Sequence, residues 1–503
     1  MLCPIGRRSK KGYESSDVFL LYKEIMSESL KQKTVRGVMW SGISHIANQA
    51  IQFLFGLLVA RILTPHEYGL VGMVLVFTSV SGVFVDSGFS TALVRKPDRT
   101  DADFSTAFHF NIVMALVVYL IIFFCAPLIA QFYDEPQLTS IARVIALNII
   151  IGSFCIVQGT QYTIKMDFKT TTKISIISLL ASGTTGVIMA YSGFGVWAIV
   201  WQFIVNKIVS TILVWFFSSW RPQRVFSKSS FHYLWSFGYK MTLSALLDVL
   251  YNNIYQIIIG KAFSPKDLGD YSRAQQFANL PSVTITGILG GITFPALSSI
   301  QHDDARLEHV YRKFLRLAAF IIFPLMVGLS ALAEPVILFL LTDKWSAAIV
   351  LLQIICFRLM WYPIHAINLH LLQVKGRSDL FLRLEIIKKI IGVAVLCISV
   401  PLGLKAMCIA GIFSSLLCLF VNTYYTGQLI NVGYWRQMRD LLPILLLSLA
   451  MGAVVVLSIC LLTSNLLKLI VGFTAGAAFY LLVAYIFRMT ELTDLLSILQ
   501  CKK

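Results

Sequence analysis

The chain has 503 residues, of which 57% are hydrophobic and only 13% are charged. Soluble globular proteins carry roughly 25% charged and about 45–50% apolar residues, so this composition excludes a soluble globular protein and predicts an integral membrane protein. The formal net charge of +17 would suit a nucleic-acid partner, but the placement of the basic residues points to membrane topology instead.

Fourteen apolar runs follow one another along the chain, and a run of about 20 residues crosses the hydrocarbon core as a helix. They cover residues 37–60, 69–94, 107–131, 140–164, 174–192, 194–216, 239–260, 270–297, 314–341, 346–372, 380–400, 405–429, 441–463 and 466–487. The run 380–400 is the most interrupted, by Glu385, Lys388 and Lys389. We therefore expect an all-α membrane protein with 14 transmembrane helices.

The basic residues are divided unevenly between the loops on the two sides of these runs. The side that holds both termini receives 30 Lys and Arg residues, and the other side receives six. Since the cytoplasmic side of a membrane protein carries the excess of basic residues, we predict that both termini are cytoplasmic. An odd number of helices would scramble this asymmetry, which supports the even count.

The chain repeats itself at a distance of 200 residues. RILTPHEYG at 61–69 corresponds to KAFSPKDLG at 261–269. Polar residues that share one helix face by a spacing of four also correspond, namely Ser44, Asn48 and Gln52 with Ser244, Asp248 and Asn252. Six helices per half form a parallel repeat, so we expect two six-helix bundles related by a pseudo-twofold axis along the membrane normal, with two C-terminal helices appended.

This repeat defines the expected domain organisation. We predict a cytoplasmic N-terminal tail (1–36), a first bundle (37–219), a cytoplasmic linker (220–238), a second bundle (239–430), two further transmembrane helices (438–488) and a cytoplasmic tail (489–503). The linker combines basic and aromatic residues, which indicates an amphipathic segment on the inner leaflet, although a plain solvated linker fits too. Met26 is an alternative start of the chain.

Ionisable residues inside the predicted helices are the first candidates for function, because such residues are costly in a bilayer and face a bundle interior or a cavity. The basic candidates are Arg143, Lys207, Arg273 and Arg358, and the acidic ones are Asp86 and Asp248. A mostly cationic cavity suits a phosphate, diphosphate or acidic sugar. Alternatively, the arginines reach the headgroups or make structural pairs. Asp248 is a candidate for neutralising one of these four bases, and both Asp248 and Asp86 are candidates for binding a coupling proton or sodium ion.

Amide side chains form a second group of candidates. Asn48, Gln52, Asn252 and Gln256 lie in the first helix of each half, where they suit the recognition of sugar hydroxyls. Hydrogen bonding between helices is the alternative, since Asn and Gln serve that purpose in membranes.

Catalytic and cofactor motifs are missing from the sequence. It contains no Walker loop GxxxxGK[ST], no GxSxG elbow and no HExxH pair, and its nine cysteines lack metal-binding spacing. We therefore expect no enzyme and no cofactor, apart from possible coupling to H⁺ or Na⁺.

Three stretches carry a resemblance to a known family. They are KTVRGVMWSGISHIANQAIQFLFGLLVARILTPHEYGLVGMVLVF, LGDYSRAQQFANLPSVTITGILGGITFPALSSIQHD and LLQVKGRSDLFLRLEIIKK. From about Lys33 to Arg488 the chain resembles Wzx-type polysaccharide flippases, in the polysaccharide-transporter branch of the multidrug/oligosaccharidyl-lipid/polysaccharide exporter superfamily.

The resemblance implies a MATE-like core of two bundles around a V-shaped central cavity. It also implies translocation of undecaprenyl-diphosphate-linked oligosaccharide from the inner to the outer leaflet of the bacterial cytoplasmic membrane, for surface polysaccharides such as the O-antigen of lipopolysaccharide. The basic cavity residues would then meet the anionic carrier, and Arg273 lies in the matching YSRAQ stretch. The expected partners are this lipid-linked oligosaccharide, membrane lipids and other polysaccharide assembly proteins, without nucleic acid.

Three other functions compete with this prediction. A cation antiporter of the same superfamily needs an acidic, aromatic cavity, which four deep basic residues argue against. A membrane glycosyltransferase, either an O-antigen ligase or a polymerase, needs a large external loop with paired catalytic groups, and the sequence has none. A non-transporting membrane scaffold would leave the charged residues within the predicted helices unexplained.

Overall fold

The computed structural model describes residues 42 and 47–500, and of residues 496–500 only the helical backbone. The predicted tail 1–36, the alternative start at Met26 and most of the beginning of the first apolar run lie outside these residues, as do residues 501–503. Every regular element within the described part is an α-helix or a short 3-10 helix, which confirms the all-α prediction.

The helices follow one another with short connections. The first half contains the helix Ala47–Ile62, α3 (Pro65–Asp86), α4 (Phe89–Arg95), α5 (Asp101–Tyr133), α6 (Leu138–Ile145), α7 (Leu147–Ile164), α8 (Phe168–Tyr191) and α9 (Val196–Phe217). The second half contains α10 (Lys228–Asn252), α11 (Ile254–Ala262), α12 (Pro265–Ser299), α13 (Asp304–Ala331), α14 (Ala333–Leu340), α15 (Ser346–Leu359), α16 (Tyr362–Val374), α17 (Ser378–Ser399) and α18 (Leu404–Ile430). The chain then continues through α19 (Tyr434–Ile459), α20 (Asn465–Ile486) and α21 (Thr490–Gln500).

Eleven helical segments of the described part are long and apolar enough to cross a membrane, so the chain is a multi-pass membrane protein. The three other predicted runs also coincide with helices. Ala47–Ile62 is short, α10 and α11 are separated at Asn253, and α17 carries the charges noted in the sequence. The count of fourteen crossings therefore remains a prediction.

Some runs that we expected to be continuous are broken. The run 346–372 divides into α15 and α16, and Pro363 lies at the start of α16, where its missing N–H is tolerated. The run 69–94 divides at Gly88, whose φ is +69°, a left-handed conformation that glycine adopts readily. A Cβ at Gly88 would lie 2.7 Å from the carbonyl oxygen of Gly238, so this break also lets α10 approach closely.

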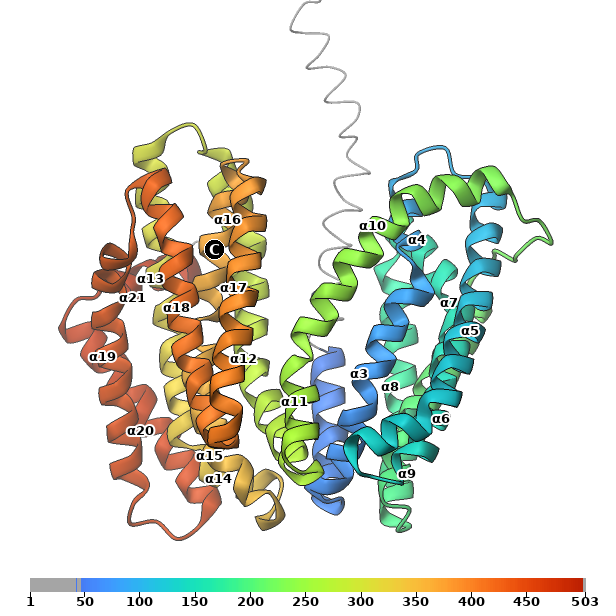
Figure 1. The fold of residues 1–503 in the computed structure, drawn as a ribbon. Coiled ribbons are helices and arrows are strands. Elements are labelled where there is room, and N and C mark those ends of the chain that lie inside the picture. The colour runs from blue at the N-terminus through green and yellow to red at the C-terminus, as the bar shows by residue number, and fades with distance from the viewer. Residues whose placement is uncertain (1–41, 43–46, 501–503) are drawn as a thin grey trace, which may run out of the picture.

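The helices form two groups that meet at one end and diverge towards the other (Figure 1). The first group contains the helices up to α9, and the second contains α12–α18, flanked on its far side by α19 and α20. At the joined end, α3 packs along α12, and α11 packs on both. The largest apolar core cluster includes residues of both halves, such as Leu70, Leu268 and Trp345.

The predicted linker lies against the first group. The backbone N–H of Gln223 donates to Ser105 Oγ, and that of Ser227 donates to Thr106 Oγ1, each at a distance of 3.0 Å. Phe231, from the first turns of α10, packs against Phe110 with its ring tilted by 53°. Because α10 runs unbroken from Lys228 to Asn252, it crosses the predicted boundary between linker and second bundle. The domain boundaries remain predictions.

Candidate functional site

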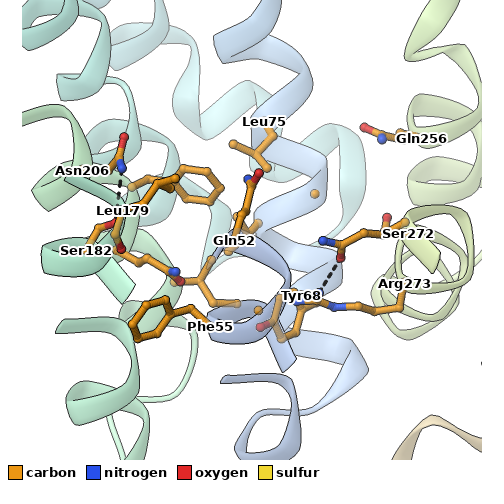
Figure 2. Close-up of a pocket in the computed structure, with 17 residues that line it drawn as sticks. Gln52, Phe55, Tyr68, Leu75, Leu179, Ser182, Asn206, Gln256, Ser272 and Arg273 are labelled. Atoms are coloured by element: carbon orange, nitrogen blue, oxygen red, sulfur yellow. Dashed lines mark hydrogen bonds between the residues drawn. The ribbon is translucent and has the colours of Figure 1, made fainter. Parts of the chain in front are cut away.

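A cavity of about 300 Å³ lies where the two halves meet. Helices Ala47–Ile62, α3, α8 and α9 line it from the first half, and α11 and α12 line it from the second (Figure 2). Its polar side chains are Gln52, Tyr68, Ser182, Gln202, Asn206, Gln256, Ser272, Arg273 and Gln276. Its lining includes no carboxylate.

Arg273 supplies the positive charge of this first cavity. The residue is only 7% exposed, and its guanidinium carbon lies 3.8 Å from the ring centroid of Tyr68 and 5.8 Å from that of Trp345. One guanidinium N–H donates to Gln276 Oε1, at a distance of 2.6 Å. Arg273 forms no ion pair within the described residues, so aromatic faces and an amide stabilise its charge while the cavity remains net positive.

A second cavity of about 590 Å³ lies between α3, α7 and α9 of the first half. It shares Leu75, Phe203 and Asn206 with the first cavity, so the two are contiguous. Lys207 lines it and packs against Gly152, where an added Cβ would lie 3.0 Å from Lys207 Cε. Polar groups of Thr78, Ser79, Asn148 and Ser153 complete the lining, again without a carboxylate.

The ammonium group of Lys207 has no hydrogen-bond or ion-pair partner among the described residues. Its neighbour Asn206 donates to Ser182 Oγ over 3.3 Å, and the Oδ1 atom of Asn148 is buried without a hydrogen-bond partner. Lys207 and Asn148 both line this cavity, but protein atoms cover the Asn148 oxygen. The ammonium group of Lys207 is therefore the group that is available to an anionic group of a ligand.

Arg358 is not among the residues that line these two cavities. In α15 it donates to Gln275 Oε1 over 2.6 Å, and its guanidinium carbon lies 5.0 Å from the ring centroid of Tyr255. Gly411 of α18 packs against its side chain, because a Cβ there would lie 3.1 Å from Arg358 Cδ. The side chain is thus held within the second half.

Arg143 also lies away from the two cavities. Its Nε donates to the carbonyl oxygen of Phe123 over 3.2 Å, and its guanidinium carbon lies 4.3 Å from the ring centroid of the same residue. Both contacts join α6 to α5, which agrees with the structural alternative named above.

Like the basic candidates, the amide candidates fall into residues that line a cavity and residues that do not. Gln52 and Gln256 line the first cavity, and Figure 2 shows Gln256 on the side of Arg273, opposite Asn206. Asn48 and Asn252 line neither cavity.

The acidic candidates lie outside both cavities too. Asp248 forms an ion pair with Lys389 that joins α10 to α17, with an O–N distance of 2.5 Å. Asp86, at the end of α3, accepts hydrogen bonds from the backbone and the hydroxyl of Ser90. The partner of Asp248 is thus Lys389 and none of the four basic candidates, so its expected role in coupling stays a prediction.

The sequence analysis missed the aromatic side chains that surround Arg273. Tyr68 lies within the first repeated loop, and Trp345 donates its indole N–H to the carbonyl oxygen of Ala60 at a distance of 2.9 Å. It also missed Asp270, which is 1% exposed and has no hydrogen-bond partner for either carboxyl oxygen. The acidic residue at the start of the apolar run 270–297 was the available signal.

Comparisons with known proteins agree on one family. The family described as "Polysaccharide biosynthesis protein" matches residues 58–350, more than half of the chain. The teichuronic acid biosynthesis protein TuaB of Bacillus subtilis is 26% identical over 360 residues, which are 70% of this chain and 73% of TuaB. The lipopolysaccharide biosynthesis protein WzxC of Escherichia coli is 24% identical over 448 residues, 85% of this chain and 89% of WzxC.

A solved structure supports the same assignment at the level of the fold. The lipid II flippase MurJ, in an inward closed conformation, has a TM-score of 0.71 at 16% sequence identity and covers 90% of this chain and 98% of its own. An inward-facing multidrug resistance MATE transporter has a TM-score of 0.58 at 16% identity, covering 78% of this chain and 100% of its own. The resemblance predicted from the sequence is confirmed, and the chain belongs to the polysaccharide biosynthesis protein family.

Proposed function

We propose that this protein carries an undecaprenyl-diphosphate-linked oligosaccharide from the inner to the outer leaflet of the bacterial cytoplasmic membrane, for the synthesis of a surface polysaccharide. The observation that carries the proposal is the pair of contiguous cavities with Arg273 and Lys207, two basic residues without a carboxylate partner in the described part of the chain. Membership of the polysaccharide biosynthesis family and the MurJ-like fold support it.

In this proposal the chain crosses the membrane fourteen times and forms two six-helix bundles with a pseudo-twofold axis along the membrane normal. The joined end faces outwards, because the loops there belong to the side with few basic residues. The diverging end faces the cytoplasm, together with both termini. The cavities would then receive the cargo from the inner leaflet, and rocking of the bundles would present it to the outer one.

The chemistry of the lining residues suggests how the cargo is held. Arg273 presents a fork of N–H donors that matches phosphate oxygens, whereas Lys207 is a point charge. Gln52, Gln256 and Asn206 offer donors and acceptors to sugar hydroxyls. The polyprenyl chain would stay in the lipid, since burying it in these polar cavities would be unfavourable.

A coupling ion is part of the proposal, either H⁺ or Na⁺. Asp248 and Asp86 are the candidate sites. At Asp248, an incoming cation would have to compete with Lys389 for the carboxylate.

The alternative of a cation antiporter has less support. A cavity for cations needs carboxylates, and none of the described residues that line the two cavities carries one. An anionic cargo fits this charge better.

The direct test is flipping of a fluorescent undecaprenyl-diphosphate-linked oligosaccharide in vesicles that contain the purified protein. The Arg273→Ala variant should lose most of this activity. Arg143→Ala is the matched control, since Arg143 is another membrane-embedded arginine but lies outside both cavities, and it should retain activity. Vesicles with the wild-type protein that flip no more than protein-free vesicles, under an imposed proton or sodium gradient, would reject the proposal.

A further inference from the structure

The two repeated loops each start a long helix in the same way. Pro65 begins α3 and Pro265 begins α12. Each helix has a capping box, in which Thr64 pairs with Glu67 and Ser264 pairs with Asp267. Proline at the first helical position and an acidic residue in the first turn both favour a fixed start. The first turns of α3 and α12 are therefore rigid equivalents.

These two first turns touch each other reciprocally. A Cβ on Gly69 would lie 1.7 Å from the carbonyl oxygen of Pro265, and a Cβ on Gly269 would lie 1.8 Å from that of Pro65. Real Cβ atoms essentially never come within 3.0 Å of another heavy atom. Only glycine permits such a backbone approach at either position. The glycine of each half packs against the proline carbonyl group of the other half. The two contacts are equivalent, so a local twofold axis passes between the loops.

Further contacts between the halves surround this pair. The Arg61 side chain donates to the carbonyl oxygens of Phe339 and Leu340, the latter over 2.8 Å. Lys344 Nζ donates to the carbonyl oxygen of Ile62 over 3.0 Å. Arg61 and Lys344 are two of the six basic residues on the side that the sequence predicts to be external.

Two more contacts complete the set. Trp345 donates to Ala60, as described above, and Lys261 Nζ lies 3.0 Å from Asp134 Oδ2 at the end of α5. The side chains of Arg61, Lys344 and Trp345 all bind backbone carbonyls of the opposite half. Contacts to a fixed backbone hold two helix ends in one relative position, so this end of the molecule is closed by a defined surface.

We infer that Gly69 and Gly269, each seated on the proline carbonyl of the other half, form the surface on which the outer gate of the transporter closes. The inference rests on the proposed function for the sidedness of this end. Alternating access requires this contact to break and to form again in every cycle. A methyl group at either glycine holds the helices apart, so it shifts the equilibrium towards the state with an open outer end.

The shift can be measured by labelling, independently of any cargo. The reporter is Leu75→Cys, at a residue that lines both cavities, in a chain whose native cysteines are replaced and whose thermal unfolding midpoint matches that of the wild type. A membrane-impermeant maleimide is added from either side of the membrane. We expect Gly69→Ala and Gly269→Ala each to raise labelling from the outside by about tenfold, because overpacking disfavours the closed contact.

The twofold relation sharpens the expectation. The two single variants should act equally, and the double variant should add little to either, since one methyl group already separates the helices. Gly287→Ala is the matched control in α12, because its added Cβ would have no atom within 4 Å among the described residues, apart from its chain neighbours and the adjoining backbone of its own helix. It should leave labelling unchanged.

A second variant covers the case that the glycine variants do not fold. Trp345→Phe removes the hydrogen bond to Ala60 without adding volume, and it should raise outside labelling in the same direction by a few-fold. Outside labelling that matches Gly287→Ala in all of these variants would overturn the gate. Raised labelling, in a protein that flips no lipid-linked oligosaccharide, would instead reject the proposed function and keep the gate.

Discussion

The polar side chains inside the two halves have different partners, although the halves share a sequence repeat. In the first half, Lys207 and Asn206 border cavities, and Lys207 has no partner among the described residues. In the second half, Arg358 donates to Gln275. Two basic residues that the sequence predicts at equal depth therefore differ in their partners, because the neighbouring helices decide whether a charge is available.

A buried hydrogen-bond network joins α19 to the second half. Gln437 Nε2 of α19 lies 3.1 to 3.2 Å from four acceptors, and its two N–H groups are shared among them: the oxygens of Tyr311, Asn368 and Thr426 and the carbonyl oxygen of Val432. Each of the four side chains is fully or almost fully buried. A satisfied network of this kind specifies one packing arrangement.

Ion pairs also join the appended helices to the second half. They link Arg312 of α13 to Asp440 of α19 and link Lys313 and Arg316 of α13 to Asp494 and Glu491 of α21. We therefore expect α12–α20 to move as one body, against which the first half rocks.

The largest expected effect comes from breaking the buried network. Gln437→Leu removes the contacts of Gln437 to Tyr311 and Asn368 and leaves the buried Tyr311 hydroxyl without its partner, which should lower the free energy of unfolding by about 2 kcal/mol or more. The measurement is the thermal unfolding midpoint of the purified protein in detergent. In the first half, Asn206→Leu removes a single hydrogen bond to Ser182 and should cost well under half of that. Equal losses in the two variants would contradict the comparison.

The next effect separates binding from stability. Lys207→Gln should lower flipping by about tenfold, since one charge-assisted contact to the cargo is lost, while the unfolding midpoint stays unchanged. Arg358→Gln breaks the contacts to Gln275 and Tyr255, so this variant, unlike Lys207→Gln, should lower the unfolding midpoint. A stability loss in Lys207→Gln would mean that this lysine is structural after all.

A smaller effect tests the bracing of the second half. Arg312 is 33% and Asp440 is 9% exposed at the side chain, so a double-mutant cycle with alanine should give a coupling energy of only about 1 kcal/mol. Chemical unfolding of the four proteins measures it. A coupling energy of zero would mean that the ion pair between Arg312 and Asp440 does not help to hold α19 on α13.

The smallest effect concerns the exposed ion pair between the halves. Asp134→Asn removes the partner of Lys261, but the Asp134 side chain is 81% exposed, so we expect less than about 0.5 kcal/mol. Outside labelling of the reporter at position 75 should also stay unchanged, since backbone contacts close this end. If Asp134→Asn raised outside labelling as much as Gly69→Ala, the ion pair would be what closes the gate.

Much of the fold followed from the sequence, because hydropathy and loop charge are local properties. Hydrogen bonds of a transmembrane helix are satisfied within the segment, so each run could be read separately. The breaks at Gly88 and near Pro363 were missed. At Gly88 the signal was weak, since the close approach of Gly238 lies 150 residues away along the chain.

The candidate site could be predicted only in part. Arg273, Lys207, Gln52 and Gln256 line the cavities, but the sequence offered no way to separate them from Arg358 or the other candidates. That distinction depends on partners from distant segments.

The sequence by itself determined the membrane class, the helical runs, the uneven loop charge and the repeated loops at 61–69 and 261–269. Only the tertiary structure decided that Gly69 and Gly269 meet the proline of the opposite loop, and that Lys207 lacks the partners that Arg358 has. The physical reason is that side-chain contacts between helices depend on which faces pack together. A repeat reveals equivalent positions, but it does not reveal that they touch.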